Sequence, residues 1–144
     1  MTTTHSPAAP SHTTTPRTTT YGRQMSAVML AAFALSVVHT GYAAVEGIED
    51  PTFTVTTPLA WGFYAVAFAM SALARRSGRA AQTTVLAFLA TILVIAVFYY
   101  PTTFGPEKQT VFGWFENDVY VGLLVTAFVL QVLRPRDVQL VTRR

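Results

Sequence analysis

Apolar residues gather in four long stretches that are separated by short polar segments. The stretches cover about 25–45, 58–74, 80–100 and 115–133. An α-helix of about 20 residues rises far enough to cross the roughly 30 Å hydrocarbon core of a bilayer. The pattern therefore predicts an all-α membrane protein with four transmembrane helices.

Prolines mark several of the expected helix ends. Pro58 suits a first helical position, because it lacks only an amide that would have no partner there. Pro101 is expected to stop the third span and Pro135 the fourth. The start of the fourth span has two interpretations, because its apolar core is short. The helix either extends through 111–118 or begins at an Asn117 cap.

The polar segments between the stretches predict how the helices connect. Residues 75–79 are too few for anything but a tight turn, so the second and third spans should be antiparallel neighbours, with Gly78 ending the second helix. The expected architecture is an up-down-up-down four-helix bundle over 25–133. Residues 1–24, rich in Thr and Pro, are expected to be a disordered tail, and 134–144 a basic tail.

Charged residues divide between the two sides of this bundle. Six of the seven acidic residues fall in the first and third connections or in the adjoining outer turn of the fourth stretch, and nine of the ten basic residues fall elsewhere. Lys and Arg near span ends favour the cytoplasmic side during insertion, so both termini and the middle turn are expected to be cytoplasmic. The six acidic residues are Glu46, Glu49, Asp50, Glu107, Glu116 and Asp118. The nine basic residues are Arg17, Arg23, Arg75, Arg76, Arg79, Arg134, Arg136, Arg143 and Arg144.

Composition narrows the class and the partners. With 51% hydrophobic and 12% charged residues, the chain is typical of a multi-pass protein of the cell membrane. The arginines beside the spans fit contact with acidic lipid headgroups, and no basic patch is interleaved with aromatic residues, so we expect membrane lipids and not nucleic acid as partners. Cysteine is absent, which excludes thiol catalysis and thiolate metal sites. The preference for Arg over Lys is typical of a bacterial genome rich in GC.

The sharpest polar pattern consists of His39, Tyr42 and Glu46. On a helix, offsets of three and seven residues place these side chains on one face. Such a group could relay protons, ligate haem iron or donate to a quinone carbonyl. Alternatively, His39 only hydrogen-bonds a neighbouring helix or interfacial water. Haem is disfavoured because no second histidine lies in a span to complete the ligation, so no cofactor is expected.

Aromatic and acidic residues concentrate on the expected outer side. Thirteen of the eighteen aromatic residues lie there, whereas an aromatic belt normally marks both interfaces. The apolar segment around Trp114 is expected to lie among the headgroups, pack over the bundle or meet a partner protein. The acidic residues lack the fixed spacing of a calcium loop, so no metal site is expected. The candidate partner surface consists of Glu49, Asp50, Phe112, Trp114, Phe115, Glu116 and Asp118.

No catalytic motif is present, so we expect a protein that is not an enzyme. The first hypothesis is an accessory, assembly or scaffold subunit of a larger membrane complex, with other membrane-protein subunits or further copies of itself as partners. The first alternative is a small oligomeric transporter or channel with His39 at its outer entrance. The second alternative is a redox-associated subunit that contributes to a quinone or haem site.

Overall fold

Four α-helices make up most of the computed structural model, which describes residues 17–134 apart from 49 and 103–109. The predicted tails, 1–16 and 135–144, lie outside the described residues, as do Glu49 and Glu107. The helices are α1 (Arg17–Glu46), α2 (Pro58–Leu73), α3 (Arg79–Val94) and α4 (Val111–Leu133). Beyond α3 the chain continues through a π-helical turn, η1 (Ile95–Tyr99), and a 3-10 turn, η2 (Tyr100–Thr102).

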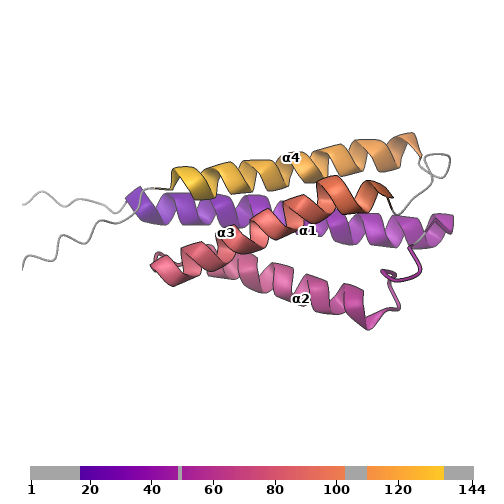
Figure 1. The fold of residues 1–144 in the computed structure, drawn as a ribbon, viewed down its shortest axis with the longest axis horizontal. Coiled ribbons are helices and arrows are strands. Elements are labelled where there is room, and N and C mark those ends of the chain that lie inside the picture. The colour runs from indigo at the N-terminus through magenta and orange to yellow at the C-terminus, as the bar shows by residue number, and fades with distance from the viewer. Residues whose placement is uncertain (1–16, 49, 103–109, 135–144) are drawn as a thin grey trace, which may run out of the picture.

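The four helices close into a bundle in which each packs against two others (Figure 1). Helix α1 contacts α2 and α4, and α3 contacts the same two helices. The contact between α1 and α4 is the most extensive, and the two run side by side along the molecule (Figure 1). Among the described residues, the structure is therefore all-helical, as the sequence predicts.

Three of the helical segments are long and apolar enough to cross a membrane: Thr20–Glu46, Arg79–Thr102 and Val111–Leu133. Helix α2, with 16 residues, is apolar but shorter. At 1.5 Å per residue it covers about 24 Å, somewhat less than a typical hydrocarbon core. Length and composition therefore indicate a membrane protein.

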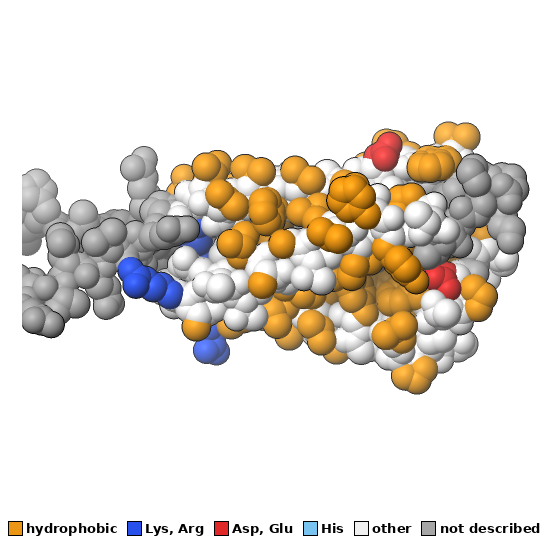
Figure 2. All heavy atoms as spheres, in the orientation of Figure 1, with side chains coloured by type: hydrophobic (Ala, Val, Ile, Leu, Met, Phe, Trp, Pro, Cys, Tyr) orange, Lys and Arg blue, Asp and Glu red, His pale blue; other side chains and the backbone are white. Residues whose placement is uncertain are grey.

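Apolar side chains also cover the outside of the bundle (Figure 2). Large hydrophobic residues point outward along all four helices, which is unusual for a protein in water but suits contact with lipid tails. They include Val38, Val66, Phe68, Val94, Val125, Val129 and Val132. Hydroxyl groups on the helices bond to their own backbone, as expected in lipid. Thr91, for example, donates to the carbonyl oxygen of Ala87 at 2.9 Å.

The core is built around Phe33 of α1, whose side chain is fully buried. Its ring lies 6.0 Å from that of Phe63, 5.9 Å from that of Phe88 and 6.5 Å from that of Tyr120, measured between centroids. One aromatic residue thus contacts all three other helices. Small residues such as Ala67, which has no exposed surface, belong to the same core. They let the helix backbones approach closely, and the resulting dispersion contacts stabilise helix packing in lipid.

Helix α1 begins at Arg17, although 17–24 were expected to belong to a disordered tail. The reason is tertiary contact. A Cβ on Gly22 would lie only 3.1 Å from the Arg134 guanidinium and 3.2 Å from the carbonyl oxygen of Ala74. This part of α1 therefore packs tightly against the ends of two other helices, and the packing extends the helix beyond the apolar stretch.

We call the two extremities of the bundle the basic end and the acidic end, and they lie at opposite ends of the long axis (Figure 2). The basic end carries Arg75, Arg76, Arg79 and Arg134. The acidic end carries Glu46, Asp50, Glu116 and Asp118.

Hydrogen bonds from α4 close the basic end. The Arg134 guanidinium, 4% exposed, donates to the carbonyl oxygens of Ala74 at 2.9 Å and Arg76 at 3.0 Å. These carbonyls lie just beyond α2, where a cation also interacts favourably with the helix dipole. The side-chain amide of Gln131 donates to the carbonyl oxygen of Gln82 at 2.7 Å.

Two predicted boundaries can be compared directly with the structure. Pro58 occupies the first turn of α2, as expected. Gly78, expected to end the second helix, is instead the N-cap of α3, with extended backbone angles. Helix α2 has already ended at Leu73, because Arg134 binds the carbonyls that follow it.

Candidate functional site

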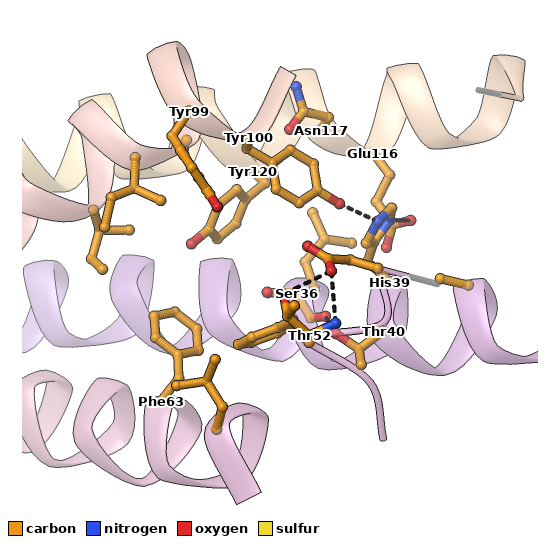
Figure 3. Close-up of a pocket in the computed structure, with 18 of the residues that line it drawn as sticks. Ser36, His39, Thr40, Thr52, Phe63, Tyr99, Tyr100, Glu116, Asn117 and Tyr120 are labelled. Atoms are coloured by element: carbon orange, nitrogen blue, oxygen red, sulfur yellow. Dashed lines mark hydrogen bonds and ion pairs between the residues drawn. The ribbon is translucent and has the colours of Figure 1, made fainter. Parts of the chain in front are cut away.

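A cavity of about 370 Å³ lies between the helices toward the acidic end (Figure 3). All four helices contribute to it, together with η1, η2 and the segment that follows α1. Its walls are largely apolar and include Leu35, Ile48, Phe53, Leu59, Phe63, Ile92, Ile95 and Ala96. Its polar lining comes from Ser36, His39, Thr40, Asp50, Thr52, Tyr99, Tyr100, Glu116, Asn117 and Tyr120.

His39 is the centre of the polar group that lines the cavity. Its Nδ1 lies 3.0 Å from Oε2 of Glu116, and its Nε2 lies 2.9 Å from the hydroxyl oxygen of Tyr100. An ionised carboxylate only accepts hydrogen bonds, so Nδ1–H donates to Glu116. In a neutral imidazole, Nε2 then accepts from the Tyr100 hydroxyl. Both ring nitrogens are thus engaged, and the ring joins α1 to α4 and η2 (Figure 3).

Glu116 is the most deeply buried charged group of the cavity. Only 2% of the residue is exposed, and its Oε1 atom has no hydrogen-bond partner among the residues that the structure describes. A buried carboxylate oxygen without a donor costs free energy, because it has lost water and gained nothing in exchange. Oε1 therefore keeps an unused capacity to accept a hydrogen bond, on a residue that lines the cavity.

The local sequence of α4 explains why Glu116 points inward. Helix α4 begins at Val111, and the hydroxyl of its N-cap Thr110 accepts from the Gly113 amide at 3.0 Å. Of the two interpretations of this helix start, the extension through 111–118 agrees with the structure and the Asn117 cap does not. Inward positions then recur at steps of three or four residues, as expected for one helix face. They are Gly113, Glu116, Tyr120, Leu124, Ala127 and Gln131.

The prediction for Glu116 therefore needs correction. It was assigned to an outer partner surface because it was grouped with the acidic and aromatic residues of the outer side. The helix begins at Val111, and its first two turns carry Glu116 on the face that packs against α1.

A π-helical turn brings two tyrosines to the cavity. In η1 the chain follows the wider i to i−5 pattern, with the Tyr100 amide donating to the carbonyl oxygen of Ile95. Pro101 explains this locally, because its ring would clash with the carbonyl four residues earlier in a regular α-helix. The wider turn ends α3 with Tyr99 and Tyr100 lining the cavity. Such turns are frequent at functional sites.

A second set of hydroxyl groups fixes the side of the cavity between α1 and α2. The Tyr64 hydroxyl donates to the carbonyl oxygen of Ser36 at 2.9 Å and lies 2.6 Å from Oγ1 of Thr40. Tyr64 is 5% exposed, so its hydroxyl depends on these partners. Ser36, His39, Thr40 and Ala43 occupy successive positions on the one face of α1 that borders the cavity.

The group predicted from sequence, His39 with Tyr42 and Glu46, is brought together only in part. Tyr42 reaches α4 instead of His39: its hydroxyl lies 3.2 Å from Oγ1 of Thr110, and its ring lies 5.0 Å from that of Phe112. Glu46 ends α1 with an exposed side chain. The carboxylate that His39 contacts is therefore Glu116, which lies on another helix.

The other members of the predicted partner surface have different positions. Phe112, Trp114 and Phe115 are half-exposed or exposed on the first turns of α4, and Asp118 is exposed as well. Asp50 lines the cavity and accepts two hydrogen bonds from Thr52, one from the amide at 2.8 Å and one from the hydroxyl at 2.7 Å.

Sequence reasoning missed Tyr100 and Tyr120 as cavity residues. Tyr120 could have been found from its position four residues after Glu116 on the inward face of α4. Tyr100 is positioned by the π-helical turn, and the signal for that turn is the proline that follows it.

The donor set of the cavity does not resemble a metal site. Within the described ranges, no three His, Cys, Asp or Glu side chains come close enough together to hold an ion. Haem ligation by His39 would require a ring nitrogen that is now occupied by Glu116 or Tyr100.

Comparison with known proteins finds no matching family model, no similar curated protein and no similar solved structure. The function is therefore argued from the site.

Proposed function

We propose that this membrane protein binds a small, largely apolar molecule that carries a hydrogen-bond donor, and that the ligand occupies the cavity near the acidic end. One observation carries the proposal: an apolar cavity of about 370 Å³ is lined by a buried carboxylate, one oxygen of which has no hydrogen-bond partner among the described residues. A largely apolar pocket with a few converging polar groups is the usual form of a small-molecule site. The proposed role is not catalytic.

A purely structural role for the polar group is less favoured by the energetics. A buried charge with its hydrogen-bond partner often contributes less to stability than well-packed apolar residues of similar volume. Here His39 and Glu116 line a cavity, and one carboxylate oxygen of Glu116 has no partner in the part of the chain that the structure describes. A group that stabilised the bundle alone would be expected to have all of its acceptors satisfied.

Thermal unfolding of the purified protein in lipid nanodiscs tests the proposal. A library of small amphipathic molecules, with a lipid extract of the native membrane, is screened for compounds that raise the unfolding temperature. The Ala43→Leu variant fills the cavity from α1, where Ala43 is 8% exposed, and should lose the response to any true ligand. Thr91→Ala, on an exposed part of α3, is the matched control and should keep it. A compound that stabilises both variants equally does not bind in the cavity, and the absence of any response in the native protein would contradict the proposal.

The charge distribution also supports an orientation. We propose that the basic end faces the cytoplasm and the acidic end the opposite side, with all four helices crossing the cell membrane. The chain has no cysteine, so Arg76→Cys and Asp118→Cys each introduce a single label site. In intact cells, an impermeant maleimide should label Asp118→Cys alone. Labelling of Arg76→Cys alone would reverse the orientation.

A second candidate function, an accessory subunit of a larger membrane complex, is favoured by the exposed aromatic residues of α4. Phe112 is 50% exposed, Trp114 48% and Phe115 67%. Aromatic residues of this kind are enriched at protein interfaces. A tagged protein, extracted mildly from native membranes, should then co-purify with near-stoichiometric partners, and Trp114→Ala with Phe115→Ala should release them. A homogeneous oligomer without other subunits would favour the transporter alternative, and a visible absorption band would favour the redox alternative.

A further inference from the structure

We infer that the ligand of the cavity is an organic cation, an amine with an apolar body, whose ammonium group binds the carboxylate of Glu116. This inference rests on the proposed function and adds the chemical class of the ligand. It depends on three features of the cavity: its formal charge, the direction of its hydrogen bonds and the chemistry of its walls.

The charged groups that line the cavity favour a cation. Glu116 and Asp50 supply two carboxylates, and none of the described lining residues is Lys or Arg. A neutral His39 ring can make both of its hydrogen bonds, to Glu116 and to Tyr100, so this geometry does not require a positive charge on the ring. A buried negative charge without a compensating cation is expensive, and an ammonium group would supply that compensation.

The directions of the hydrogen bonds select a donor. His39 donates to Oε2 of Glu116, while Oε1 is buried and has no partner in the described part of the chain. A quinone offers only acceptor oxygens and would leave Oε1 unpaired. An anion would be repelled by both carboxylates. An alcohol could donate to Oε1, but a charged donor forms a hydrogen bond roughly twice as strong.

The walls suit an apolar and aromatic ligand body. The rings of Phe53 and Phe63 lie 5.6 Å apart, and Tyr99, Tyr100 and Tyr120 line the same cavity. Aromatic rings attract cations through their quadrupoles and pack well against apolar groups. Acidic and aromatic residues together therefore match both parts of a hydrophobic amine.

Three probes with one body and different head groups test the inference: phenylbutylamine, phenylbutanol and phenylbutyrate. Dissociation constants are measured by isothermal titration calorimetry with the full chain in nanodiscs, and empty nanodiscs correct for partitioning into lipid. The amine should bind about tenfold or more tightly than the alcohol, since its hydrogen bond to the carboxylate is charge-assisted. The butyrate should bind most weakly. Glu116→Gln should remove the preference for the amine, and Asp50→Asn should reduce it.

The outcomes separate this inference from the proposed function. Equal binding of amine and alcohol to the native protein, or tighter binding of the butyrate, would overturn the cation as ligand but leave a cavity that binds small molecules. If none of the probes binds although the nanodisc screen yields another ligand, the cation inference also fails. If neither the probes nor the screen gives a response that Ala43→Leu abolishes, the proposed function fails as well. The comparison of probes uses the native chain, so it holds even if Glu116→Gln does not fold.

Discussion

Each end of the bundle buries one charged side chain, Glu116 of α4 at the acidic end and Arg134, the C-cap of α4, at the basic end, and the two have different surroundings. At the basic end, Arg134 donates to backbone carbonyls just beyond α2 and lies against Gly22 without room for a further methyl group. At the acidic end, Glu116 lines a cavity, and among the described residues it has a hydrogen-bond partner on one oxygen only. Gln131, near Arg134, also has an unpaired oxygen, but it is neutral and is not among the residues that line the cavity. The difference teaches that a buried charge can tie helices together at one end and, at the other, line a cavity with part of its hydrogen-bonding capacity unused, which is the basis of the proposed function.

The largest effect is expected from breaking the basic end with Arg134→Ala. The substitution removes two hydrogen bonds from a charged donor and opens space beside Gly22, so it should lower the free energy of unfolding by about 3 kcal/mol. Arg76→Ala is the control, because the Arg76 side chain is exposed. Thermal unfolding in one detergent measures both. If the two variants were equally stable, the hydrogen bonds of Arg134 would not contribute to the stability of the bundle.

A smaller change in the free energy of unfolding should distinguish the packing of the core from that of the cavity. Ala127 is fully buried in the core, so Ala127→Leu overpacks it and should cost about 2 kcal/mol. Ala43 lines the cavity, so Ala43→Leu has space to occupy and should change stability by less than about 1 kcal/mol. The same unfolding assay compares the pair. Equal destabilisation would mean that the cavity is filled in solution.

A further prediction concerns the helix start that supports Glu116. Thr110→Ala removes the cap at the Gly113 amide and should cost about 1 kcal/mol. Hydrogen exchange, followed by mass spectrometry, should show faster exchange confined to the first turn of α4. Thr91→Ala, whose hydroxyl bonds only its own helix, should be nearly neutral. Faster exchange at the basic end as well would show that the two ends are coupled.

The smallest change in stability is expected for Glu116→Gln. The amide oxygen can still accept from His39, and the substitution removes a buried charge with an unpaired oxygen. The free energy of unfolding should therefore change by less than about 1 kcal/mol, while ligand binding weakens. Unfolding and calorimetry on the same preparation check the two halves of this prediction. A large loss of stability would show that Glu116 mainly stabilises the helix bundle.

Part of this picture could be predicted from the sequence. The apolar stretches indicated the helices, and Pro58 indicated the start of α2, because both signals are local. The partner of His39 could not be predicted in the same way, since Glu116 is 77 residues away and is chosen by the packing of α1 against α4. The early start of α1 was missed for the same reason, because Gly22 contributes only through contact with Arg134. For α4, one local signal in the sequence did indicate the buried face. Inward residues recur at intervals of three or four positions between Gly113 and Gln131.

The π-helical turn in η1 has a consequence for how such a cavity could arise. A π-helical turn is an α-helix with one extra residue, and each residue of an α-helix corresponds to a rotation of about 100°. Loss of a single codon within 95–99 would therefore rotate Tyr100 away from His39 and leave the preceding helix unchanged. Insertion of a single residue into a regular α-helix would thus be enough to bring Tyr100 to His39. A cavity with this polar contact could therefore evolve from a regular four-helix bundle in one step.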